Sequence, residues 1–258
     1  MVQGGDIPVQ IGSPWFNQQS CCSYSVVPAP LTYKGSQALK FDLRRTDPVV
    51  SNRHRSEITQ PGEPPGTLTR WYGAAFYLAN NYEPDPQPEA IWQWHQESTS
   101  GSPPFAIWLR DGYLEVLRTM STAIDGGWEV RPPYDSRYPR LKLNGQDVLA
   151  PVNQWFTLVI NIKWTTNGTG YIHIWFNGQL AFSRTPGMAL PQPQAQVPTA
   201  VDLGITDYAQ GGGGGNYMKI GVYKWTFPNA LDTITSRVMY VDEIRVGNAN
   251  ATYNDVAP

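Results

Sequence analysis

Short runs in which apolar and polar residues alternate recur along the whole chain and predict β-strands. The clearest cover residues 71–79, 105–109, 113–117, 156–164, 171–176 and 239–246. Each has strand length, and turn residues rich in glycine and proline separate them. Asn177-Gly178 follows one such run directly and is a strong signal for a two-residue hairpin turn. Because helical periodicity is almost absent, we expect an all-β fold, a two-sheet antiparallel β-jelly roll.

Length and composition indicate a single domain that could bind sugars. The 258 residues fit a single domain over 1–258, and the 10 Trp and 14 Tyr could stack on the apolar faces of sugar rings. The net charge is −2 with no basic run, so a nucleic-acid partner is not expected. No stretch is long and apolar enough to span a membrane. We expect a monomer.

The cysteines and glycosylation signals bear on the location of the protein. Cys21 and Cys22 are adjacent and could form a disulfide, stay free or pair between chains. Asparagine sequons at Asn167 and Asn250 mildly favour secretion. The chain does not begin with a charged segment followed by an apolar one, so we expect a signal peptide to have been removed from a secreted, extracellular protein.

Residues 52–59 form the first candidate site segment. In a strand, Arg53, Arg55 and Glu57 share one face, and His54 lies on the other unless a bulge redirects it. Two arginines and a carboxylate on one face can form an anion site that an internal ion pair holds in place. The alternative is a solvated ladder of surface charges.

Residues 91–96 form the second candidate segment. Alternation puts Gln93 and His95 on one face and Trp92 and Trp94 on the other. A glutamine and a histidine two residues apart on a strand face can together hydrogen-bond one carboxylate. The alternative is a polar outer face above a buried tryptophan pair.

Residues 216–225 form the third candidate segment. Alternation gives one face to Tyr217, Lys219, Gly221, Tyr223 and Trp225. Gly221 would leave a bare spot where a ligand can approach the backbone. A lysine beside a tyrosine can lower the pKa of the phenol, because the cation favours the phenolate. The alternative is a tyrosine-rich outer face without chemistry.

Three motifs in this order resemble those of jelly-roll polysaccharide lyases, whose fold is a concanavalin A-like sandwich with a concave substrate cleft. They are Arg-Ser-Glu at 55–57, Gln-x-His at 93–95 and Tyr-x-Lys-x-Gly-x-Tyr at 217–223. The likeness covers about 40–247. It is strongest to the glucuronan lyases of family 20, and extends to heparin lyase I and the family 7 alginate lyases. The alginate-lyase arginine motif usually continues with another arginine, but here Ile58 is followed by Thr59.

The resemblance implies a role for each candidate residue. Tyr223 would remove the C5 proton of a uronate and protonate the leaving oxygen, with Lys219 tuning it. Gln93 and Arg55 would neutralise the carboxylate, and His54 would join them or act as the base. The residues expected to bind substrate are Arg53, His95, Tyr217, Trp94 and Glu57. His95 also ranks second as a catalytic candidate.

The implied function is endo-acting cleavage of a β-1,4-linked glucuronate polymer by β-elimination, with an acidic polysaccharide as partner. No cofactor or metal is needed for the chemistry, although the family resemblance allows a structural calcium ion. Three alternatives stay open: an alginate or heparin-like lyase, a non-catalytic lectin-like carbohydrate-binding domain, and a glycoside hydrolase. The last would need two facing carboxylates, and no segment displays them cleanly.

Overall fold

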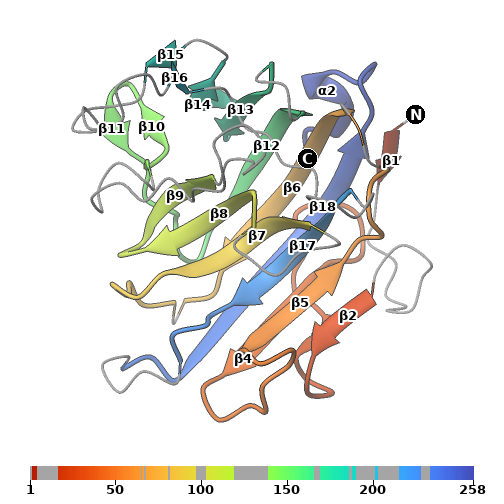
Figure 1. The fold of residues 1–258 in the computed structure, drawn as a ribbon. Helices are drawn as coiled ribbons and strands as arrows, with labels where there is room; N and C mark the ends of the chain where they lie inside the picture. The colour runs from red at the N-terminus through yellow and green to blue at the C-terminus, as the bar shows by residue number, and fades with distance from the viewer. Residues whose placement is uncertain are drawn as a thin grey trace.

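The computed structural model describes residues 2–4, 17–64, 66, 68–80, 82–96, 103–118, 139–165, 169–185, 188–189, 201–202, 215–227 and 233–258. The sequon at Asn167 lies outside these residues. Two large antiparallel sheets face each other, with the smaller one in front in Figure 1. The described part of the chain has one helix, the four-residue α2 (Tyr253–Val256). This is the all-β jelly roll that the sequence predicts.

The larger sheet has eight strands. Seven follow one another in the order β14 (Gln179–Arg184), β13 (Tyr171–Phe176), β12 (Trp155–Trp164), β6 (Leu68–Leu78), β18 (Ser236–Gly247), β4 (Leu39–Arg44) and β3 (Val26–Pro28). The eighth strand, β1 (Val2–Gly4), pairs with β18. Asn177 and Gly178 both have positive φ and join β13 to β14, so the predicted hairpin turn is confirmed.

The smaller sheet has six strands and carries all three candidate segments. Its order is β2 (Asn17–Ser20), β5 (Arg55–Thr59), β17 (Asn216–Tyr223), β7 (Glu89–Gln96), β8 (Phe105–Arg110) and β9 (Tyr113–Arg118). Two two-stranded ribbons complete the fold, β10 (Lys142–Leu143) with β11 (Gln146–Asp147) and β15 (Met188–Ala189) with β16 (Val201–Asp202).

The hydrophobic core fills the space between the two sheets. On β17, Met218, Ile220 and Val222 point into it and are at most 2% exposed. Trp92 of β7 meets Phe76 of β6 across the core, with ring centroids 5.5 Å apart. Burying one face of each strand fixes its register, because a shift of one residue would turn the apolar set outward. The opposite face of the six-stranded sheet is thereby free to carry polar side chains.

Gly221 marks a β-bulge in the middle of β17. The pairing with β7 shifts between Ile220 and Tyr223, and Gly221 has a φ of +139°. A Cβ at Gly221 would lie 2.2 Å from the carbonyl oxygen of Ser56 and 2.9 Å from the ring of Phe41. The prediction that Gly221 leaves room for a ligand is therefore wrong. Glycine is needed here because the backbone bends through a conformation that other residues rarely adopt.

Two further observations concern the cysteines and the question of a membrane-spanning helix. Cys21 and Cys22, directly after β2, form a disulfide, which resolves the alternatives that the sequence left open. Among the described residues, no helix is long and apolar enough to cross a membrane.

Candidate active site

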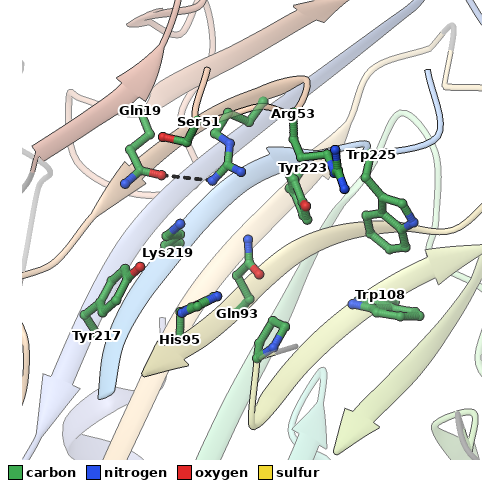
Figure 2. A pocket seen from close by; sticks show the side chains of 12 residues that line it. Gln19, Ser51, Arg53, Gln93, His95, Trp108, Tyr217, Lys219, Tyr223 and Trp225 are labelled. Atoms are coloured by element: carbon green, nitrogen blue, oxygen red, sulfur yellow. Dashed lines mark hydrogen bonds between the residues drawn. The ribbon is translucent and has the colours of Figure 1, made fainter. Parts of the chain in front are cut away.

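A cavity of about 500 Å³ lies on the outer face of the six-stranded sheet. Figure 2 shows it from close by. Its lining consists of Gln19, Ser51, Arg53, Arg55, Gln93, His95, Pro103, Trp108, Tyr217, Lys219, Tyr223 and Trp225. Seven of the ten residues that the sequence predicts for the site are in this lining.

Strand pairing brings the predicted residues together although they are far apart in sequence. Lys219 lies directly opposite Gln93 of β7. Tyr223 lies opposite Arg55 of β5. Side chains of directly paired residues point to the same side of a sheet and lie close together. The prediction that these four residues share one outer face is therefore confirmed.

Glu57 is a buried carboxylate in contact with two residues of the cavity lining. It is 1% exposed, and its Oε1 accepts a hydrogen bond from Nε2 of Gln93 at 2.6 Å. Its Oε2 is 3.4 Å from Nη1 of Arg55, whose Nη1 also donates to Oε1 of Gln19 at 3.0 Å. Glu57 was expected to bind substrate, but it lies beneath the lining residues. It orients Arg55 and Gln93 instead.

Lys219 is a buried cation that faces the cavity. The whole residue is 4% exposed, and burial lowers the pKa of its ammonium group, partly offset by the charge of Glu57. Within the described residues, no carboxylate lies within ion-pair distance of its Nζ. A buried charge without an ion-pair partner is costly, and an anionic ligand would reduce that cost.

Tyr223 lies beneath the guanidinium group of Arg55, which is 4.6 Å from the centre of its ring. Burial raises the pKa of the Tyr223 phenol above its ordinary value, and the charge of Arg55 opposes this effect. The prediction that Lys219 lowers this pKa is wrong, because burial outweighs the nearby cations and the cations that act on Tyr223 are Arg55 and Arg53. Lys219 lies instead over the ring of Tyr217, at 5.3 Å.

His54 and Trp94 do not belong to the cavity. His54 is 8% exposed, and its ring meets the core residue Phe227 edge to face at 5.8 Å. No bulge turns it outward, so its expected role as base or carboxylate ligand does not fit this structure. Trp94 is fully buried and packs 4.8 Å from the ring of Tyr72. The expectation that Trp94 contacts sugar is wrong, because strand alternation points it into the core.

A tight turn places Arg53 at the rim of the cavity. Ser51 and Asn52 both have positive φ, and the backbones of Val50 and Arg53 hydrogen-bond to each other on either side of them. Arg53 is exposed, and its guanidinium donates to the carbonyl of Asn52 at 2.9 Å. His95 and Tyr217, which pair across β7 and β17, close the opposite end, with rings 5.6 Å apart.

Five lining residues are not among the site residues predicted from the sequence: Gln19, Ser51, Pro103, Trp108 and Trp225. Gln19 comes from β2, a four-residue strand with no hydrophobic pattern. Trp108 and Trp225 form an aromatic shelf beside Tyr223, with ring centroids 4.9 Å apart. Alternation within 105–109 could have found Trp108, because its neighbours Ile107 and Leu109 point into the core.

The lining contains three cations and, among the described residues, no carboxylate. The two facing carboxylates of a glycoside hydrolase are therefore not found in this cavity. Elsewhere in the described chain, the one cluster of metal-ligating side chains joins Cys21, Cys22 and Asp47, and the two sulfurs are in the disulfide. The structural calcium ion that the family resemblance allows has no assigned ligands.

Comparison with known proteins decides the family. A family model described as polysaccharide lyase matches residues 12–245. The chain belongs to this polysaccharide lyase family. No curated protein sequence matches it significantly.

Solved structures with the same fold agree with this assignment. The endo-β-1,4-glucuronan lyase from the fungus Trichoderma reesei has a TM-score of 0.69 at 20% identity, covering 99% of this chain and 97% of the other. A family 7 alginate lyase, A1-II′, in complex with substrate has a TM-score of 0.54 at 12% identity, covering 93% and 94%. The cellulose-induced protein Cip1 has a TM-score of 0.54 at 13% identity, covering 90% of each chain. At these identities the likeness shows a shared fold.

Proposed function

We propose that this polysaccharide lyase cleaves a β-1,4-linked polymer of glucuronate by β-elimination, at internal bonds of the polymer. The observation that carries the proposal is Lys219, a buried cation without an ion-pair partner among the described residues, in the same cavity as Tyr223. A uronate carboxylate supplies the missing negative charge. The likeness to a glucuronan lyase supports this choice of polymer.

The carboxylate-binding step uses the polar side of the cavity. Lys219 and the amide of Gln93 lie opposite each other on paired strands, so both can reach one carboxylate. Neutralising that carboxylate makes the proton on the adjacent C5 more acidic, because the negative charge that develops on removal of the proton is stabilised where it forms. Glu57 holds the amide of Gln93 in place for this contact.

The proton-transfer step uses Tyr223. In a β-linked glucuronate, the C5 hydrogen and the C4 oxygen lie on the same side of the ring, so one side chain can reach both. Tyr223 as phenolate takes the C5 proton, the C4–O4 bond breaks, and the same proton goes to O4. The products are an unsaturated uronate and a new reducing end. Burial disfavours the phenolate that this step requires, and the charge of Arg55 over the Tyr223 ring offsets part of that cost.

The test is a panel of polysaccharides followed by ultraviolet absorbance, because a lyase creates a conjugated double bond in its product. We expect absorbing product from glucuronan, little from alginate or heparin, and none from unmodified cellulose or xylan. The rate on glucuronan should fall with added salt, which screens the attraction between cavity and polymer. Sugar binding without absorbing product from any acidic polymer would instead identify a lectin-like domain.

A further inference from the structure

The cavity has two sides that differ in their chemistry. On one side of Tyr223 lie the polar and charged groups Gln19, Arg55, Glu57, Gln93 and Lys219. On the other side lies a separate apolar cluster of Ala90, Ala106, Trp108 and Leu117, against which Tyr223 and Trp225 pack. Figure 2 shows Trp108 and Trp225 on the side of the cavity opposite Tyr217 and Lys219.

Tyr223 lies at the border between these sides. Arg55 covers its ring at 4.6 Å, and the ring of Trp225 is 5.2 Å away. Across the bulge, Tyr223 pairs with Ala90, which is 1% exposed and belongs to the apolar cluster. The side chain assigned to proton transfer therefore marks the point where the cavity changes from charged to aromatic.

The reaction fixes which sugar must lie on which side. The sugar that loses its C5 proton carries its carboxylate on C5, so this carboxylate points toward Lys219 and Gln93. Its O4 is near Tyr223, which returns the proton to that oxygen. The next sugar, joined through O4 toward the non-reducing end, extends past Tyr223 and away from Lys219. It therefore lies against Trp225 and Trp108.

We propose that this second sugar is held by stacking on the Trp225–Trp108 shelf and not through its charge, so the enzyme requires a uronate on only one side of the bond that it cleaves. This inference rests on the proposed function. Trp225 is half-buried and offers an apolar ring face, which suits the C–H face of any β-linked hexose, and Trp108, 9% exposed, packs against it at an interplanar angle of 53°. On this side of Tyr223 the cavity lining has one cation, Arg53. Its side chain is exposed at the rim, where an ion pair with a carboxylate contributes little.

The test compares glucuronan with a β-1,4 polymer in which glucuronate alternates with glucose. We expect wild-type protein to cleave both, with kcat/KM values within about tenfold, since an exposed ion pair at Arg53 accounts for only a small factor. Mass spectrometry should find one kind of product from the alternating polymer, with the unsaturated uronate at the non-reducing end and glucose at the reducing end.

Two variants separate stacking from charge. Trp225→Ala should lower kcat/KM by about tenfold on both polymers alike, because ring stacking does not depend on the carboxylate. Arg53→Ala should also lower it on both polymers, because Arg53 acts on the Tyr223 phenol, and any extra loss confined to glucuronan should be small. Trp155→Ala is the matched control, since Trp155 is a half-buried tryptophan on β12 of the other sheet. It should leave the rate per folded molecule unchanged on both.

The outcomes distinguish this inference from the proposed function. Cleavage of glucuronan together with a loss of more than about 100-fold on the alternating polymer would overturn the inference while leaving the proposed function intact. A Trp225→Ala effect confined to glucuronan would also overturn it. If neither polymer gives absorbing product, the proposed function itself fails, and the inference fails with it.

Discussion

Two buried charge clusters of the molecule differ in how their charges are paired. The closed cluster consists of Lys224, Arg237, Asp85 and Glu89. The open cluster consists of Arg55, Lys219 and Glu57. Both contain two cations and are almost entirely shielded from solvent. The closed cluster has two carboxylates, whereas the open cluster has one.

Within the closed cluster every charge has a partner. Nζ of Lys224 is 2.6 Å from Oδ2 of Asp85, and Nε of Arg237 is 2.8 Å from Oε2 of Glu89. Because Arg237 lies on β18 and Glu89 on β7, the cluster joins the two sheets. In the open cluster, Glu57 pairs with Arg55, and Lys219 is left facing the cavity. The difference shows which cluster stabilises the fold and which can take up an anion.

The largest expected effect is on the rate, from Tyr223→Phe. This change removes only the hydroxyl, so the ring still packs against Trp225 and the protein should melt as wild type does. General acid–base groups contribute about 100- to 10,000-fold, and one group serving both steps should reach the top of that range. The measurement is the initial rate of absorbing product from glucuronan.

Tyr217→Phe is the matched control, and it should cost far less because Tyr217 is assigned to binding only. A folded Tyr223→Phe variant that keeps more than about a tenth of the wild-type rate contradicts the assignment. His95, the histidine of the cavity lining, would then be the next candidate for the base.

Lys224→Met tests the closed cluster. Removing Lys224 leaves two buried carboxylates, Asp85 and Glu89, to share the single cation Arg237, so the free energy of unfolding should fall by about 3–5 kcal/mol. Denaturant unfolding of wild type and variant measures this difference. An unfolding free energy within about 1 kcal/mol of wild type would show that the closed cluster does not stabilise the fold as assigned.

Lys219→Met, the same substitution in the open cluster, should do the reverse. Burial already disfavours the charge of Lys219, so its removal should leave the free energy of unfolding unchanged or increase it. The kcat/KM on glucuronan should nevertheless fall by about 10- to 100-fold, since a hydrogen bond to a charged group is lost. Strong destabilisation with an unchanged rate per folded molecule would contradict the assignment of Lys219 to substrate binding.

The smallest expected effect is a shift in the pH profile. Burial lowers the pKa of Lys219, so as pH rises its cation is lost earlier than that of a free lysine. The alkaline limb of kcat/KM should therefore reflect this loss. In the Lys219→Arg variant the guanidinium group stays charged throughout the range in which a lysine titrates. The alkaline limb of this variant should therefore move to higher pH. Identical alkaline limbs in both proteins would assign that limb to another group.

Strand alternation was sufficient to predict the outer face of β17. It separates Lys219 and Tyr223 from Met218, Ile220 and Val222, because only one arrangement buries the apolar set. The same rule predicts that Trp94 points to the other face of the strand from Gln93, and that His54 points to the other face from Arg55. Both corrections concern roles taken from the family resemblance that went against this rule.

Features that depend on pairing between distant segments could not be predicted. The contact of Gln19 with Arg55 exists because β2 adds to the edge of β5. The cation over Tyr223 is Arg55 from the neighbouring strand and not Lys219 from its own, because directly paired residues are closer than residues four apart on one strand. Nothing in either local sequence specifies these pairings.

The most direct test of the open cluster is binding to the inactive Tyr223→Phe variant. Calorimetry would compare a glucuronate oligosaccharide with a cello-oligosaccharide of the same length, which differs in having no carboxylates. The account predicts that Tyr223→Phe prefers the glucuronate ligand by about tenfold or more, and that adding Lys219→Met removes most of this preference. Equal affinity for the two ligands, or a preference that survives the loss of Lys219, would contradict it.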